Sequence, residues 1–193
     1  TAQAPRFKRF LIEVFEGDED QLEKIAVIEE AMGYSLIPSC HLEKFFMLIG
    51  SGANGKSVLL ATLLELIGKK NVSAVQPDQF DNRFQRGHLF KKLINMVTEI
   101  KEGGEIADAQ LKSLTSGELT TAENKFAPPF DFIPYATHWF GTNHLPHTRY
   151  FSDALFRRGI ILTFNNKFEG QKRDVKLGDL LKTELSGIFN TAL

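Results

Sequence analysis

Apolar residues recur along this chain in two patterns, one typical of amphipathic helices and the other typical of buried strands. Phe7, Phe10, Leu11 and Val14 fall on one face of a helix, and residues 6–35 are predicted to be helical. Apolar runs without helical spacing predict strands near residues 44–49, 72–75, 92–100, 136–142 and 159–164. Further helices are predicted at 56–67, 107–116 and 175–190, a mixture of helix and loop at 78–92, and a loop or hairpin at 119–133. Because strands alternate with helices, we expect an α/β fold with a parallel five-stranded sheet flanked by helices.

A glycine-rich segment lies between the first predicted strand and the helix that follows it. It reads Gly50-Ser51-Gly52-Ala53-Asn54-Gly55-Lys56-Ser57, and it fits the phosphate-loop pattern G-x-x-x-x-G-K-[ST] in the required context of strand, loop and helix. The backbone N–H groups of such a loop, and those at the start of the helix as far as Val58, point at phosphate oxygens. Lys56 is expected to reach the β- and γ-phosphates, and the Ser57 hydroxyl to ligate Mg²⁺. The segment therefore predicts a nucleoside triphosphate and Mg²⁺ at residues 50–58.

The same glycines admit a second interpretation. Gly50, Gly52 and Gly55 also spell G-x-G-x-x-G, which is the fingerprint of dinucleotide-binding folds. In that fingerprint a lysine and a hydroxyl directly after the loop have no role, and an acidic residue follows about 20 positions further on. Asp78 lies beyond that distance. The triphosphate interpretation is therefore favoured.

Composition and charge narrow the classes of protein further. The chain has 193 residues and a formal net charge of −1, so charge alone indicates no particular partner. No apolar run approaches the roughly 18 residues of a membrane span, and the N-terminus does not resemble a signal peptide. Cys40 is the single cysteine, which excludes an intrachain disulfide and a thiolate zinc cluster and fits a reducing cytoplasm. The chain begins without methionine and stops within a predicted helix, so we expect it to be a domain of a longer polypeptide.

Polar groups that suit phosphate hydrolysis follow two of the later predicted strands. Glu99 ends an apolar strand and is the candidate general base. The position before it, which is often a second acid, is Thr98, so Ser57 would be the one direct protein ligand of the metal ion. Asn143 also follows an apolar strand, where an amide orients the attacking water or senses the γ-phosphate. The alternative for Asn143 is an Asx turn before Pro146.

Two adjacent arginines, Arg157 and Arg158, come immediately before the last predicted strand. A guanidinium stabilises the charge that develops on a phosphoryl group during transfer, and a neighbouring subunit can deliver it. The alternative is a pair of surface arginines in ion pairs. An assembly of subunits in a ring favours the catalytic role, and a monomer favours the surface role.

Taken together, these segments resemble superfamily 3 helicases, and most of all the helicase domain of phage and plasmid primase-helicases. The resemblance is carried by GSGANGKS (50–57), INMVTEI (94–100), LKSLTSGELTTAENKFAPPFDF (111–132), FGTNHLP (140–146) and ALFRRGIILTF (154–164). It extends to the N-terminal helical segment (5–36) and to the terminal helix (181–193), and so covers nearly the whole chain. It implies an AAA+ type core in a hexameric ring, with ATP bound between subunits and single-stranded DNA in the central channel.

The resemblance also implies roles for individual residues. It assigns Walker A to Lys56 and Ser57, Walker B to Glu99, sensor 1 to Asn143, and the arginine finger to Arg157 or Arg158. Segment 111–132 corresponds to a motif whose hairpin meets DNA, and its best DNA contacts are Lys112, Lys125 and Phe126. The alternative for Phe126 is packing in a core rich in phenylalanine. Glu118, Glu123 and Asn124 leave this segment with fewer positive charges than the family usually has.

The expected organisation is an N-terminal helical region at 1–42, an AAA+ ATPase core at 43–170 and a C-terminal helix at 171–193. The expected function is an ATP-dependent DNA helicase or translocase, fused to a primase or other replication domains. It would act without a membrane, in the cytoplasm of a bacterial host if a phage or plasmid encodes it. Two other functions stay open: a phosphotransferase that acts on a small molecule, and a nucleotide-switched replication assembly module that unwinds nothing.

Overall fold

The computed structural model describes residues 2–100, 106–144, 153–170 and 174–193 of the chain. Every predicted site residue falls within these ranges. Pro146, on which the alternative for Asn143 depends, lies outside them. Within the same ranges, no helix is both long enough and apolar enough to cross a membrane.

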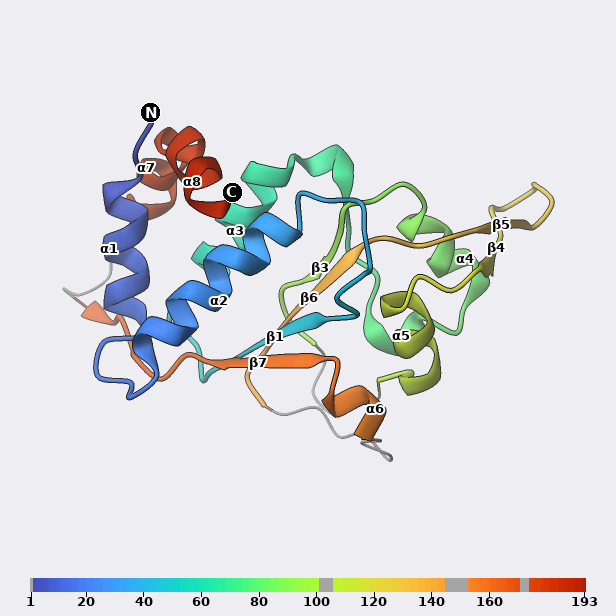
Figure 1. Cartoon of the computed structure of the whole chain (residues 1–193), viewed down its shortest axis with the longest axis horizontal. Coiled ribbons are helices and arrows are strands. Elements are labelled where there is room, and N and C mark those ends of the chain that lie inside the picture. Colours follow the sequence, from blue (N-terminus) through green and yellow to red (C-terminus); the bar gives the residue numbers. More distant parts are fainter. Residues whose placement is uncertain (1, 101–105, 145–152, 171–173) are drawn as a thin grey trace.

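Five parallel strands form the central sheet (Figure 1). In chain order they are β1 (Phe45–Ile49), β2 (Val72–Ser73), β3 (Ile94–Val97), β6 (Thr137–Thr142) and β7 (Gly159–Thr163). Their order across the sheet is β2-β3-β6-β1-β7, and each neighbouring pair is parallel. The carboxyl ends of β3, β6 and β1 therefore lie next to one another at one edge of the sheet. The prediction of an α/β fold of the P-loop type with five parallel strands is confirmed.

Helices cover both faces of this sheet because its side chains alternate between two hydrophobic clusters. Phe46 and Leu48 of β1 point to one face, whereas Phe45 and Met47 point to the other. The first face is covered by α1 (Pro5–Val14), α2 (Gln21–Tyr34), α3 (Lys56–Ile67), α7 (Leu177–Thr183) and α8 (Leu185–Ala192). The second face packs against α5 (Asp108–Thr115), α6 (Asp153–Phe156) and the segment with η2 (Pro77–Gln79), α4 (Arg83–Arg86) and η3 (Gly87–Leu89). A last short helix, η1 (Lys69–Asn71), joins α3 to β2.

Several predicted elements differ in extent from the observed ones. The strand predicted at 92–100 covers only Ile94–Val97, and the strand predicted at 72–75 covers only Val72–Ser73. The helix predicted at 175–190 is two helices, since Glu184 breaks it with φ −100° and ψ 6°. This break places the Glu184 carboxylate at the start of α1, where it accepts hydrogen bonds from the backbone N–H groups of Arg6 (3.1 Å) and Phe7 (2.9 Å).

The segment predicted as a loop or hairpin at 119–133 is a hairpin. Its antiparallel strands are β4 (Thr120–Ala122) and β5 (Phe130–Phe132). Figure 1 shows that this hairpin extends away from the five-stranded sheet, with α4 beside it. The side chains of Ala122 and Phe132 are buried and join the second hydrophobic cluster, so the base of the hairpin is anchored in the core.

Candidate nucleotide-binding and catalytic site

The phosphate-binding loop runs from the carboxyl end of β1 to the start of α3, as the sequence predicts. Gly55 closes the loop with a φ of +93°, in the left-handed region that favours glycine. Helix α1 packs directly behind this turn. A Cβ atom added to Gly55 would lie 2.8 Å from Cγ2 of Val14 and 3.2 Å from the ring of Phe10. The loop therefore requires glycine here for its backbone and for the approach of α1.

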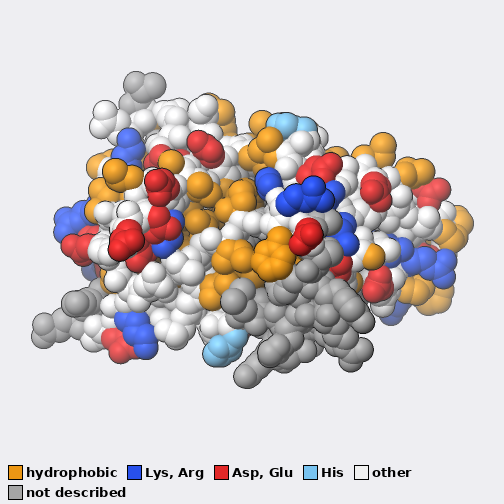
Figure 2. Space-filling model, turned by 60° about the horizontal axis from the view of Figure 1, so that its bottom comes forward, with side chains coloured by type: hydrophobic (Ala, Val, Ile, Leu, Met, Phe, Trp, Pro, Cys, Tyr) orange, Lys and Arg blue, Asp and Glu red, His pale blue; other side chains and the backbone are white. Residues whose placement is uncertain are grey.

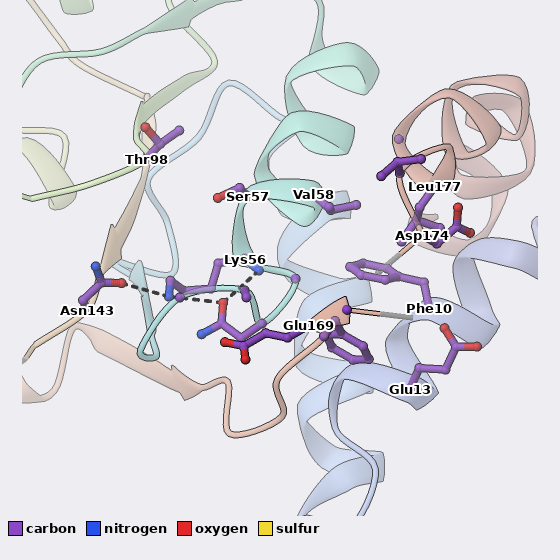
Figure 3. Close-up of a pocket in the computed structure, with 18 of the residues that line it drawn as sticks. Phe10, Glu13, Lys56, Ser57, Val58, Thr98, Asn143, Glu169, Asp174 and Leu177 are labelled. Carbon is purple, nitrogen blue, oxygen red and sulfur yellow. Dashed lines mark hydrogen bonds between the residues drawn. The ribbon is translucent and has the colours of Figure 1, made fainter. Parts of the chain in front are cut away.

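Lys56 is the first residue of α3, and its side chain turns back into the loop (Figure 3). Its Nζ donates to the backbone oxygen of Gly50 and lies 3.3 Å from Oδ1 of Asn54 and 3.4 Å from Oδ1 of Asn143. Burial lowers the pKa of Lys56, and the nearby carboxylate of Glu99 opposes this shift. The ammonium is thus held by neutral oxygens. A phosphate oxygen in their place would form a stronger, charge-assisted hydrogen bond.

Glu99 and Asn143 meet at the carboxyl ends of β3 and β6. Nδ2 of Asn143 lies 3.4 Å from Oε1 of Glu99, while Oδ1 of the same amide faces Nζ of Lys56. Asn143 therefore links the lysine and the carboxylate. The structure brings together the three residues to which the sequence analysis gave phosphate, base and sensor roles.

Gly141 allows β3 and β6 to approach closely at this point, and the sequence analysis did not identify it. A Cβ atom added to Gly141 would lie 2.3 Å from the backbone oxygen of Thr98. The backbone N–H of Ile100 donates to the Gly141 oxygen at 2.9 Å, which holds the chain around Glu99 against β6. A glycine within a buried strand pattern is the signal that could have marked this approach.

Lys56, Glu99 and Asn143 line a cavity of about 830 Å³. Of the predicted nucleotide-binding residues, Gly52 to Val58 line it, and so do Thr98, Glu99 and Asn143. Gly50 and Ser51 do not line it, and Gly50 takes part through its carbonyl oxygen on Lys56. The volume suits a small-molecule ligand of nucleotide size.

The far wall of the cavity comes from the two ends of the chain. Figure 3 shows Phe10 and Glu13 of α1 next to Asp174 and Leu177, all on the side of the view away from Asn143. Arg6 joins the two groups, since its guanidinium lies 3.1 Å from a carboxylate oxygen of Glu13 and 3.5 Å from one of Asp174. This wall was not predicted from the sequence. No local pattern marks it, because it forms only when α1 packs against α7.

The residues present fit a bound Mg²⁺ ion. Mg²⁺ prefers oxygen ligands, keeps several waters and needs few protein ligands when phosphates supply the rest. The exposed Ser57 hydroxyl, the Thr98 side chain and the Glu99 carboxylate line the same cavity. Among the described residues no cluster of three or more histidine, cysteine or acidic side chains could hold a metal ion by itself. The oxygen donors therefore suit a metal that arrives with the nucleotide.

The two arginines lie at the opposite edge of the sheet. The backbone oxygen of Arg158 accepts from the N–H of Phe45 at the start of β1, and neither arginine lines the cavity. Nη2 of Arg158 lies 2.6 Å from a Glu43 carboxylate oxygen and 2.9 Å from the Ser116 hydroxyl, whereas Arg157 is exposed. Figure 2 shows the side of the molecule that carries β7 and α6, where Lys and Arg side chains lie beside exposed hydrophobic side chains. The arginines cannot act on the cavity of their own chain.

The predicted DNA contacts separate into two places. Lys125 and Phe126 lie in the turn between β4 and β5, and the Phe126 side chain is fully exposed. The alternative that Phe126 packs in the core is therefore wrong. Lys112 lies on α5, away from the turn, and forms an ion pair with Asp108 at 2.8 Å.

Comparisons with known proteins agree with this fold. In an alignment of 140 residues that covers 65% of this chain, the sequence is 29% identical to a protein of Acanthamoeba polyphaga mimivirus whose name describes it as an inferred helicase (L207/L206). Among solved structures, the apo A form of the NrS-1 C-terminal region matches 99% of this chain with a TM-score of 0.74 and 16% identity. JCV helicase matches 97% of this chain with a TM-score of 0.50 and 16% identity.

The chain spans 14% of the mimivirus protein, 45% of the NrS-1 region and 58% of the JCV helicase chain. At 16% identity the two structural matches establish the fold alone, so the chemistry has to be inferred from the residues of the site. A family model matches residues 48–158, which run from β1 through the phosphate-binding loop and the strand ends that carry Glu99 and Asn143 to the two arginines. The chain therefore belongs to that family, the family of unknown function DUF5906.

Proposed function

We propose that this chain is the motor domain of an ATP-dependent DNA helicase or translocase of superfamily 3, of the kind found in phage and plasmid primase-helicases. The observation that carries the proposal is the contact of Asn143 with both Lys56 and Glu99 at adjacent strand ends, beside the phosphate-binding loop. The likeness in fold to JCV helicase and the similarity to the mimivirus protein support it.

In this proposal ATP binds with its phosphates on the loop and the start of α3. Lys56 exchanges its neutral oxygen partners for the β- and γ-phosphates. Ser57, and Glu99 through water, would hold Mg²⁺, which would neutralise charge on those phosphates. Glu99 accepts a proton from the attacking water, and Asn143, already hydrogen-bonded to Glu99, orients that water or senses the γ-phosphate.

An arginine completes the site from a neighbouring copy of the chain. Arg157 and Arg158 lie at the far edge of the sheet from the cavity, which suits an action on the next subunit in a ring. Arg157 is the better placed of the two, because its side chain is exposed, whereas Arg158 contacts Glu43 and Ser116 within its own chain. A finger of this kind contributes on the order of 10³–10⁵ in rate.

Single-stranded DNA is the proposed partner of the β4–β5 hairpin. A cation and an exposed aromatic ring together suit a phosphate and a base of a single strand, and Lys125 and Phe126 are neighbours in the exposed turn. Lys112 is a less direct contact, because it lies on α5 and is paired with Asp108.

The test is single-turnover ATP hydrolysis as a function of protein concentration, with and without single-stranded DNA. The proposal expects slow hydrolysis at concentrations where the chain is monomeric, and faster hydrolysis once subunits assemble on DNA. Full turnover by the monomer, or turnover that depends on a small-molecule acceptor and not on DNA, would contradict it.

The same experiment separates the two other functions. A small-molecule phosphotransferase needs arginines that close on its own phosphates. Within the described part of the cavity wall, Arg6 is the one arginine, and it is paired with Glu13 and Asp174 at the end away from Lys56. An assembly module would bind ATP and oligomerise without DNA-dependent turnover.

A further inference from the structure

A buried arginine ties the β4–β5 hairpin to the body of the protein. Arg86, the last residue of α4, is only 7% exposed. Its Nε and Nη2 both donate to the backbone oxygen of Thr121 in β4, at 3.0 and 2.9 Å. Its Nη1 donates to the backbone oxygens of Phe80 and Asp81, at 2.9 and 3.2 Å. In the described part of the chain no carboxylate forms an ion pair with Arg86, so its charge is held by three carbonyl groups.

Other contacts make this connection stiff. The backbone N–H of Glu123 donates to the oxygen of Arg83 at 3.1 Å. Gly87 approaches the hairpin so closely that an added Cβ would lie 3.3 Å from the Glu123 oxygen. The ring of Phe90 packs edge-on against Phe130 at 5.2 Å. The hairpin is therefore held to the α4–η3 segment as far as the start of its turn, whereas Lys125 and Phe126 farther along the turn are exposed.

The chain that leads into α4 contacts the backbone of Glu99. Nε2 of Gln76 donates to the backbone oxygen of Glu99 at 3.2 Å. From Gln76 the chain continues through η2 to Phe80, whose ring is fully buried against His138. Residues 76–86 therefore connect the strand end that carries Glu99 to the strand that leads into the hairpin turn, and Pro77, Phe80 and Arg86 of this segment are buried.

We propose that Arg86 is a positioning residue that makes the hairpin turn follow the state of the ATP site. The inference rests on the proposed function. Because Nε and Nη2 of Arg86 both donate to the Thr121 oxygen, they fix the distance between α4 and β4 and the orientation of β4 relative to α4. A shift of residues 76–86 that begins at Glu99 is thereby passed to Lys125 and Phe126. Without these two hydrogen bonds, ATP and DNA would each still bind, but neither would change the affinity for the other.

The test measures the affinity for single-stranded DNA with and without a non-hydrolysable ATP analogue. The ratio of the two dissociation constants reports the coupling between the sites, and allosteric couplings are typically about 5-fold or more. We expect such a ratio for the unaltered chain and a ratio near unity for Arg86→Met. Arg83→Met is the matched control, because Arg83 lies on the same helix but its side chain is exposed and has only a 3.8 Å ion pair with Glu123. It should keep the ratio of the unaltered chain.

A purely structural role for Arg86 gives a different result. It would weaken DNA binding equally in both nucleotide states and leave the ratio unchanged, which overturns the proposal. If Arg86→Met does not fold, Gln76→Leu decides, since it cuts the same connection at its other end. An unchanged ratio in that variant also overturns the proposal. Failure of the unaltered chain to bind ATP or DNA at all contradicts the proposed function instead, and the coupling proposal falls with it.

Discussion

At the scale of single residues, the site depends on which charges are buried and what they contact. Lys56 is buried among three uncharged oxygens, so its charge is poorly compensated until an anion arrives. Glu99 is exposed, so its carboxylate can face water, as a group that accepts a proton from water must. The loop therefore favours a phosphate at Lys56 and leaves Glu99 free to face water.

A buried histidine predicts how the stability of the fold depends on pH. His138 lies in β6 between Phe80 and Phe140, and burial lowers its pKa from 6.5 to about 3. Between these two pH values the unfolded chain binds a proton that the folded chain does not. Stability is therefore complete above about pH 6.5 and is lost as the pH falls toward 3. At about pH 5 the protonation of His138 in the unfolded chain lowers the free energy of unfolding by about 2 kcal/mol.

Urea denaturation at about pH 7.5 and about pH 5 measures this effect. In His138→Leu the loss of stability between the two pH values should be smaller by about 2 kcal/mol, because leucine cannot bind the proton. Among the residues that the structure describes, neither nitrogen of His138 has a hydrogen-bond partner, so the variant should be no less stable than the unaltered chain at the higher pH. An equal loss in both proteins would show that His138 is not a source of the pH dependence.

Residue roles could be predicted where chain order alone fixes the position. Glu99 and Asn143 each follow an apolar run, and parallel strands bring their carboxyl ends to one edge, so their meeting with Lys56 was predictable. Arg6, Glu13 and Asp174 were not predictable, because they come together only through packing of the two chain ends. Arg86 depends in the same way on a close approach that no local pattern encodes, whereas the approach at Gly141 could have been marked by a glycine within a buried strand pattern.

At the scale of elements, helix α1 near the N-terminus contacts both the C-terminal helices and the loop that lines the cavity. Its first N–H groups are satisfied by Glu184 from the junction of α7 and α8, and its buried face supports Gly55. The sequence predicted α1 from its apolar spacing, but the position of Glu184 requires the break between α7 and α8.

Removal of this cap gives a prediction for α1. Glu184→Ala leaves two N–H groups at the helix start without their carboxylate, which should lower the free energy of unfolding by about 1–2 kcal/mol. Nucleotide affinity should fall as well, because Arg6, Phe10 and Glu13 of α1 line the cavity. Chemical denaturation and nucleotide titration measure both effects. Glu19→Ala, at an exposed acid between α1 and α2, is the control and should change neither quantity.

The hairpin gives a second prediction at this scale. Phe126 is fully exposed, so Phe126→Ala should leave stability unchanged while weakening single-stranded DNA binding by about 1–3 kcal/mol. Lys125→Ala should also weaken DNA binding and should reduce the dependence of log K on log salt by about 0.7. Fluorescence anisotropy over a salt series measures both. Phe189→Ala on α8 is the control, and if it weakened DNA binding as much as Phe126→Ala, the hairpin assignment would be wrong.

At the scale of the whole molecule, the sheet separates the cavity from the two arginines. The cavity lies at the carboxyl ends of the strands, and Arg157 lies near their amino ends. The fold was predictable because five apolar runs alternate with helices. The extra hairpin was predicted only as a loop or hairpin, since its short strands carry little periodic signal.

Mixed assemblies test whether two chains share a site. Arg157→Ala and Lys56→Ala should each reduce turnover strongly when tested alone, by about 10³-fold or more for the arginine. A mixture of the two variants should regain part of the turnover, because some interfaces then combine an intact Lys56 with an intact Arg157. A second mixture, in which Arg158→Ala replaces Arg157→Ala, identifies which arginine acts on the neighbouring site. No recovery in either mixture would mean that the arginines do not act between chains.

The central claim is that Lys56, in contact with Asn143 and near Glu99, forms an ATP-hydrolysing site. Single-turnover hydrolysis of ATP by Lys56→Ala, at a protein concentration that permits assembly and in the presence of single-stranded DNA, tests it most directly. Lys69→Ala is the matched control, because Lys69 is an exposed lysine of η1 outside the cavity. We predict that Lys56→Ala abolishes DNA-dependent hydrolysis while Lys69→Ala and the unaltered chain hydrolyse ATP alike. Hydrolysis by Lys56→Ala at the rate of the unaltered chain would contradict the account.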